Sequence, residues 1–293
     1  MTEPTRRLDP TRADAAITSR EFALEIPRRG IVAGQEWNPA GLRGRVGIIH
    51  GLGDHAGRYG RAVRALVDKG FVVEAIDLPG HGRSYGPRGH VESWDEYREA
   101  MEAWWDRPRE RGGPPIALVG HSMGALLALE WAIRRPDELR GIVLSAPPFE
   151  VVLRATMLKV RMAQIIVRLW PGFSQQTTIL PSMLSHDPEV IRAHNEDPLV
   201  HYLMSARLFF EFQSVNAALR QSAPRLPVPA LVLHGTGDVI SSPVGSERWA
   251  KAAPPGMADL RLYEGLYHEI LNEPDGPRIA EEAAAWIERR PTR

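Results

Sequence analysis

Cysteine is absent from the 293-residue chain. Without thiols the protein can form no disulfide bond, no thiolate-bound metal site and no cysteine nucleophile. The absence fits a reducing compartment, although it does not require one. The chain also has no net charge at pH 7, because 36 lysines and arginines balance 36 aspartates and glutamates. This balance gives no basic field that would attract nucleic acid, so we expect no nucleic-acid partner.

Long apolar runs are also missing. Uncharged stretches are all too short to span a bilayer, and residues 1–20 lack the apolar core of a secretory signal. We therefore expect a cytoplasmic protein that touches a membrane at most peripherally. The hydrophobic fraction of 43% and the charged fraction of 25% are ordinary for a globular domain with a sizeable core.

Apolar strand-like runs alternate with helix-like segments through the first half of the chain, and this rhythm predicts a mostly parallel sheet covered on both faces. After Pro147-Pro148 the strands stop. We expect a loose tail (1–18), a first core part (19–148), a helical cap insertion without convincing strands (149–225) and a second core part (226–293). An insertion of about 75 residues is too long to be a simple loop.

One strand-like run, Ile116–Val119, ends in the pentapeptide Gly120-His121-Ser122-Met123-Gly124, and a strong helix former follows at once. This is the strand–turn–helix setting of the G-x-S-x-G nucleophile elbow. The tight turn leaves no room for side chains two residues before and after the serine, so glycine occupies both places. The sequence predicts Ser122 as a nucleophile at the start of a helix, where the dipole favours negative charge.

A serine hydroxyl needs a contacting base and a third group that orients the base. In a parallel sheet such groups collect beyond the carboxyl ends of strands. Asp238 and His268 each follow a predicted strand, and the order Ser122, Asp238, His268 is the one that this architecture uses. Asp77 is a rival acid, but it precedes the elbow and its loop looks structural.

Most of the other histidines are expected to be structural or to lie on the surface. His121 lies within the elbow itself and should point away from Ser122. The residues near strand ends that we expect to be structural are His50, His81, His90 and His234.

The oxyanion of an acyl-transfer reaction needs two hydrogen-bond donors. The backbone N–H of Met123, directly after the nucleophile, supplies one. The second is expected from the turn after an early strand, at the N–H of Leu52 in His50-Gly51-Leu52-Gly53.

The same turn supports a rival from another class. Gly51-x-Gly53-x-x-Ala56 follows a strand, and Glu74 and Asp77 stand about where a ribose ligand would be sought. A dinucleotide-binding oxidoreductase is therefore the alternative. This alternative leaves Ser122, Asp238 and His268 unexplained.

The combined motifs resemble the monoglyceride lipase and lysophospholipase group of the α/β-hydrolase family. The resemblance runs from about residue 20 to the end, and it is carried by the elbow together with His50-Gly51-Leu52-Gly53-Asp54-His55, Arg58-Tyr59, Asp77-Leu78-Pro79-Gly80-His81-Gly82-Arg83-Ser84, Asp197-Pro198-Leu199-Val200, His234-Gly235-Thr236-Gly237-Asp238 and Tyr263-Glu264-Gly265-Leu266-Tyr267-His268-Glu269. Two departures are Ala125, where the family often has glycine, and Asp54, where glutamate is common.

The resemblance implies an α/β-hydrolase fold, the triad Ser122, Asp238 and His268, an oxyanion hole from Leu52 and Met123, and a cap over an acyl-binding tunnel. We predict a serine carboxylester hydrolase that cleaves monoacylglycerols and needs no metal or cofactor. A lysophospholipase or a short-chain carboxylesterase of the same fold is the alternative. The sequence does not give the oligomeric state.

The segment Val151–Trp170 is mainly apolar, with Arg154, Arg161 and Arg168 at seven-residue intervals. If it forms one helix, these arginines share a stripe. The segment then either rests on a lipid surface, with its arginines meeting phosphates, or packs on the body as an ordinary cap helix with solvated arginines. Both readings stay open.

Overall fold

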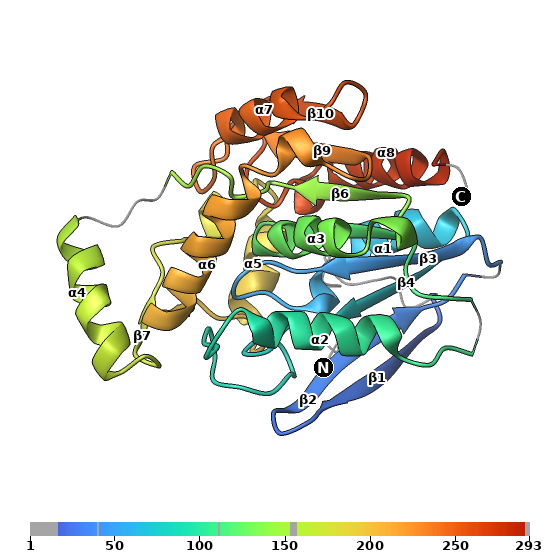
Figure 1. Cartoon of the computed structure of the whole chain (residues 1–293). Helices are drawn as coiled ribbons and strands as arrows, with labels where there is room; N and C mark the ends of the chain where they lie inside the picture. The colour runs from blue at the N-terminus through green and yellow to red at the C-terminus, as the bar shows by residue number, and fades with distance from the viewer. Residues whose placement is uncertain (1–16, 40, 111, 153–156, 291–293) are drawn as a thin grey trace, which may run out of the picture.

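The structure is a computed structural model that describes residues 17–39, 41–110, 112–152 and 157–290. An eight-stranded sheet runs through it in the order β1-β2-β4-β3-β5-β6-β9-β10 (Figure 1). The strands β1 and β2 form an antiparallel hairpin at one edge. Strand β2 also pairs antiparallel with β4, and all other neighbours are parallel. The bounds are β1 Ser19–Ile26, β2 Gly30–Trp37, β3 Gly44–Ile49, β4 Phe71–Ile76, β5 Ala117–His121, β6 Gly141–Ser145, β9 Ala230–Gly235 and β10 Ala258–Tyr263.

Helices cover both faces of the sheet, and each face has its own hydrophobic cluster. One cluster includes α1 (Gly60–Asp68) and α8 (Gly276–Glu288), and the other includes α2 (Asp95–Asp106), α3 (Met123–Arg134) and the tryptophan of α7 (Pro243–Ala252). The central strands are buried on both sides, which explains their continuous apolar runs. The predicted α/β class with a mostly parallel sheet is confirmed.

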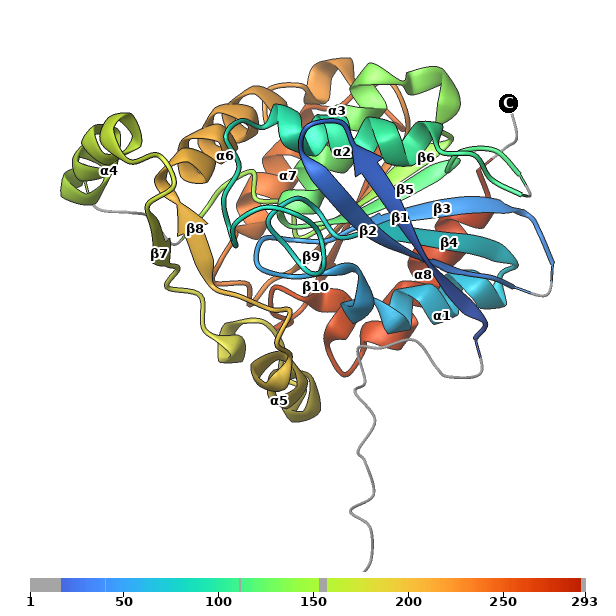
Figure 2. The same cartoon turned by 90° about the horizontal axis from the view of Figure 1, so that it is seen from below.

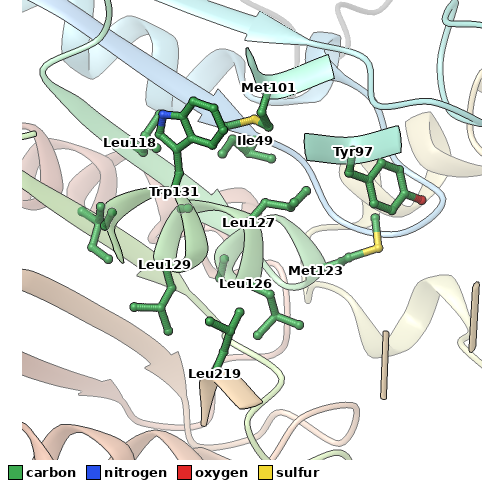
Figure 3. Packing of buried hydrophobic residues seen from close by; sticks show 14 of the residues in the cluster. Ile49, Tyr97, Met101, Leu118, Met123, Leu126, Leu127, Leu129, Trp131 and Leu219 are labelled. Carbon is green, nitrogen blue, oxygen red and sulfur yellow. The ribbon is translucent and has the colours of Figure 1, made fainter. Parts of the chain in front are cut away.

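Helix α3, which begins directly after Ser122, is buried along most of its length. Leu126, Leu127, Leu129 and Trp131 are each at most 2% exposed, and they belong to the cluster that also includes Met101 of α2 and Leu219 (Figure 3). Burying a large apolar side chain contributes about 1.5–3 kcal/mol. The start of α3 is therefore held rigidly against the sheet.

The chain between β6 and β9 leaves the sheet. It contains α4 (Met157–Leu169), α5 (Pro188–Glu196) and α6 (Ala206–Leu219), and both views place α4 apart from the sheet (Figures 1 and 2). Two short strands, β7 (Ser174–Gln176) and β8 (Leu203–Ser205), pair antiparallel, so the expectation of a strand-free insertion is wrong. Three paired residues are too few to show an alternating pattern in the sequence.

The domain boundaries predicted from the sequence stay a prediction. The tail expected for residues 1–18 lies outside the described residues, apart from its last two positions. The remaining elements are single 3-10 turns: η1 Ala56–Arg58, η2 Pro136–Glu138, η3 Pro181–Met183, η4 Ala223–Arg225 and η5 Ile270–Asn272.

Candidate active site

Ser122 occupies a strained turn between β5 and α3. Its φ of 51° and ψ of −118° are unusual for a residue with a side chain. A Cβ at Gly120 would lie 2.3 Å from the carbonyl oxygen of Gly124, and a Cβ at Gly124 would lie 2.2 Å from that of Ile49. Both elbow glycines are thus sterically required, one for the turn itself and one for the contact between α3 and β3.

The turn is fixed by its backbone. The N–H of Ser122 donates to the carbonyl of Ser145 on the neighbouring strand at 2.9 Å. Met123 is the first residue of α3, so its N–H has no acceptor one turn earlier in the helix. A half-buried hydroxyl therefore sits beside an available backbone donor at a helix N-terminus.

Asp238 and His268 lie beyond the carboxyl ends of the adjacent parallel strands β9 and β10. Nδ1 of His268 donates to Oδ2 of Asp238 at 2.6 Å, and both residues are buried. A carboxylate on Nδ1 leaves Nε2 as the proton-accepting atom of a neutral ring. The pair thus has the arrangement of a general base with its orienting acid.

The carboxylate of Asp238 is saturated with donors. Its Oδ1 accepts the N–H groups of Ile240 (2.8 Å) and Ser241 (3.1 Å), and its Oδ2 also accepts the Ser241 hydroxyl (2.9 Å). Burial alone would raise the pKa of Asp238. The charge of His268 and hydrogen bonds from His234 and His268 outweigh burial and hold the pKa far below its usual range. Asp238 is consequently ionised at every physiological pH.

Sequence reasoning missed two residues around this carboxylate. His234, which we expected to be structural, places Nε2 3.1 Å from Asp238 Oδ2 and Nδ1 2.7 Å from the hydroxyl of Ser246. Ser241 contacts both Asp238 and Nδ1 of His268. The serine three residues after the acid was the available signal, because backbone and hydroxyl groups at that spacing often fold back onto an aspartate.

His121 belongs to the elbow, and its ring contacts the ring of the base. Its ring centroid is 4.9 Å from that of His268, and its Nδ1 is 3.2 Å from the hydroxyl of Ser145. Burial, followed by repulsion from His268, lowers the pKa of His121 to about 4. It is therefore neutral at pH 7 and adds no positive charge next to the base.

The turn after β3 lies against the elbow. A Cβ at Gly51 would lie 3.3 Å from the Cβ of Ser122. His50 Nε2 accepts the N–H of Leu78 at 2.9 Å, so its proton is on Nδ1, which donates to the carbonyl of Gly51 at 2.7 Å. That carbonyl shares a planar trans peptide with the N–H of Leu52, so the contact fixes the direction of this N–H.

The residues of the dinucleotide alternative have other partners. Gly53 has a φ of 75°, and a Cβ there would lie 2.1 Å from the carbonyl oxygen of His201. Glu74 is fully buried among Arg45, Arg107 and Arg109. Asp77 accepts backbone N–H groups from both flanking loops. Both carboxylates are therefore already engaged by donors of the protein itself.

Within the described ranges, groups of three or more histidine, aspartate or glutamate side chains that could hold a metal ion are absent.

Residues 40–275 match the family described as "Serine aminopeptidase, S33". This match covers most of the chain. The chain belongs to this family. The chain is similar to the monoacylglycerol lipase of Mycolicibacterium smegmatis, which is 31% identical over 86% of this chain and 90% of the relative. Phospholipase YtpA of Bacillus subtilis is 30% identical over 83% of this chain and 94% of the relative.

A solved structure extends the likeness of this S33 hydrolase to three dimensions. The monoacylglycerol lipase of Paleococcus ferrophilus superposes with a TM-score of 0.79 at 30% identity, over 94% of this chain and 99% of that one. The predicted α/β-hydrolase fold and the resemblance to the monoglyceride lipase group are confirmed. The chain is a serine hydrolase of the esterase and lipase type.

Proposed function

We propose that the protein hydrolyses monoacylglycerols to glycerol and free fatty acid through an acyl-enzyme on Ser122. His268 accepts the proton of the Ser122 hydroxyl and returns it to the leaving glycerol oxygen, while Asp238 orients His268. The N–H groups of Leu52 and Met123 stabilise the oxyanion. A water molecule, activated by the same histidine, then releases the fatty acid.

One observation carries the proposal. Ser122, in a strained elbow, and His268 both follow the carboxyl ends of parallel strands, and Nδ1 of His268 donates to the buried, ionised carboxylate of Asp238. The carboxylate orients the imidazole as a general base, and the hydroxyl lies at a helix start that favours the developing negative charge. Relatives named monoacylglycerol lipase support the choice of ester.

The proposal is tested by labelling with a fluorophosphonate probe and by hydrolysis of monoacylglycerols with acyl chains of increasing length. The protein should label and should release fatty acid, and Ser122→Ala should do neither. Ser182→Ala, an exposed serine of η3, is the matched control and should behave like the wild type. An unlabelled, inactive wild type would refute the proposal.

A second substrate class is a lysophospholipid, because one relative is a phospholipase. The chemistry at the ester carbonyl is the same, so only the leaving head group differs. Rates on monoacyl esters with glycerol, glycerophosphocholine and methanol as the alcohol, at constant acyl length, separate monoacylglycerol lipase, lysophospholipase and simple esterase.

We also propose that α4 contacts a lipid surface. From its middle onward, this helix exposes Met162 (53%), Ile165 (60%), Leu169 (81%) and the following Trp170 (66%). Apolar side chains on a helix that stands apart from the sheet are costly in water and suit the interface of a bilayer (Figure 2). Among the described residues, no helix has the length and apolar character needed to cross a membrane.

The arginine stripe supports the same contact in part. Arg161 and Arg168 are exposed on α4, where they could meet phosphates, whereas Arg154 lies outside the described residues. These two arginines also line an open groove of about 660 Å³ between α4 and α6, together with Gln164, Ile165, Val167 and Phe210. None of the proposed catalytic residues lines this groove.

Co-sedimentation with vesicles that contain anionic lipid tests the contact. Arg161→Glu with Arg168→Glu, and separately Trp170→Ser, should reduce the bound fraction. The control Arg248→Glu removes an arginine that is 72% exposed on α7 and should change little. Equal binding of all variants would favour a cap helix with merely solvated arginines.

A further inference from the structure

The cap segment of residues 197–205 lies directly against the loop that carries the second oxyanion donor. The N–H of His201 donates to the carbonyl of Gly53 at 2.9 Å. A Cβ at Gly53 would lie 2.1 Å from the His201 carbonyl oxygen, so the two backbones are in contact. A second core glycine repeats the pattern, because a Cβ at Gly89 would lie 2.0 Å from the carbonyl of Leu203.

A buried side-chain pair ties the same two segments together. His55 Nδ1 accepts the N–H of Gly57 at 3.1 Å, so its proton is on Nε2, which donates to Oδ2 of Asp197 at 3.0 Å. Both side chains are at most 4% exposed. The other oxygen of Asp197 accepts the N–H of Leu199 at 2.9 Å and so shapes the turn that leads to His201.

The first oxyanion donor needs no such support. Met123 begins α3, which the hydrophobic core holds in place. Leu52, in contrast, lies in a loop. Its side chain packs against the core, but the direction of its N–H depends on what fixes the backbone of residues 51–55. His50 holds this loop from the sheet side through the Gly51 carbonyl. From the other side, the cap holds it at Gly53 and His55.

Resting on the proposed Ser122 mechanism, we infer that His55 and Asp197 are positioning residues for the oxyanion hole, and that the cap segment completes this hole rather than only covering the substrate. Breaking the pair frees one side of the loop and displaces the Leu52 donor. A misplacement of about 1 Å in a reacting group can cost about 100-fold in rate. Complete loss of one donor costs about 100- to 1,000-fold.

The test uses His55→Ala, Asp197→Ala and the double variant, with a short-chain p-nitrophenyl ester as a substrate too small to need the cap. We expect kcat to fall about 10- to 100-fold in each single variant, with KM changed less than about 3-fold. The double variant should fall no further than the worse single one, because both changes break one contact. Glu196→Ala, the exposed neighbouring carboxylate, is the matched control and should keep kcat.

A transition-state analogue distinguishes positioning from general weakening. An alkyl boronic acid forms a tetrahedral adduct on the nucleophile and places an anionic oxygen in the oxyanion hole. Its dissociation constant should rise by about the same factor by which kcat falls, and a neutral fatty-alcohol inhibitor should bind as before. Circular dichroism checks that the variants are folded. Should Asp197→Ala unfold, Asp197→Asn keeps the side-chain shape, and the same comparison is made on it.

The outcomes separate this inference from the proposed function. If the wild type does not react with a fluorophosphonate, the Ser122 mechanism itself fails. If the wild type is active and the folded variants keep kcat and boronic-acid affinity, or change only KM, the positioning role is overturned. Additive losses in the double variant would overturn it too.

Discussion

Replacing Asp238 by asparagine changes two atoms, and the structure decides where the new amide nitrogen goes. Oδ1 accepts two backbone N–H groups, from Ile240 and Ser241, so the asparagine oxygen must stay on that side. The NH₂ group then occupies the position of Oδ2 and points a donor at Nδ1 of His268, 2.6 Å away.

This donor reverses the tautomer of His268. Nδ1 must become the acceptor, so the proton moves to Nε2, which can then no longer accept the proton of Ser122. In serine proteases the equivalent change lowers kcat about 10⁴-fold. At about 1.36 kcal/mol per tenfold change, this corresponds to about 5.4 kcal/mol of barrier. We expect a loss of the same order here, with little change in KM.

Steady-state hydrolysis of a soluble monoacylglycerol at pH 7–8 measures the effect. Asp106→Asn is the matched control, because its carboxylate is 63% exposed and pairs only weakly with Arg135. A variant Asp238→Asn that retains more than a tenth of the wild-type kcat would refute the tautomer argument, as would an equal loss in the control.

Two further changes test the surroundings of the site. Glu269→Gln removes a carboxylate that binds both terminal nitrogens of buried Arg58 at 3.0 Å, and we expect about 3 kcal/mol of destabilisation in urea at pH 7. Burial raises the pKa of Glu269, but Arg58 outweighs it and brings the pKa to about 2. The contribution of this pair to the free energy of unfolding is therefore fully present above about pH 4.3 and is lost as the pH falls toward 2. The Glu269→Gln variant should lack this pH dependence. Gly124→Ala places a methyl group 2.2 Å from the carbonyl of Ile49, so we expect about 1–3 kcal/mol of destabilisation and a lower kcat.

Each of these changes has a control of the same chemistry. Glu102→Gln removes an exposed partner of Arg134 and should change the unfolding free energy by less than about 0.5 kcal/mol. Gly113→Ala adds a methyl group where no atom lies within 4 Å and should be neutral. Unfolding curves in which a test variant matches its control would show that the named contact does not act as described.

Local sterics explain why the elbow could be predicted. The pattern Gly120-x-Ser122-x-Gly124 indicates that a side chain is not tolerated at either glycine. In the structure, a Cβ atom at each of these positions would clash with a backbone carbonyl oxygen. The alternation of apolar strands and helices likewise predicted the parallel sheet, because burial on both faces requires continuous apolar runs. The catalytic roles of Ser122, Asp238 and His268 stay predictions, now with a geometry that supports them.

Local patterns also misled where long-range contacts prevail. Ser93, followed by Glu96 three residues later, predicts a capping box at the start of a helix that runs to about Arg107. The helix is present, but the predicted capping box is wrong. The helix begins at Asp95 without a side-chain cap. Instead, Glu96 accepts the N–H of Glu92 and contacts Tyr85 and Arg29 from other loops. Tertiary partners of a carboxylate outweigh a cap that is worth about 1 kcal/mol.

The sequence by itself therefore determined the features that depend on short local patterns. These are the elbow, the strand ends and the order of the acid and the base along the chain. Only the tertiary structure decided what surrounds them. Arg58 and Glu269 are 211 positions apart, and His55 and Asp197 are 142 apart, yet each pair is in buried contact. The physical reason is that a buried charged group is costly unless it is paired. Which residue pairs with it depends on how the folded chain brings distant segments together, and this is not visible in the local sequence.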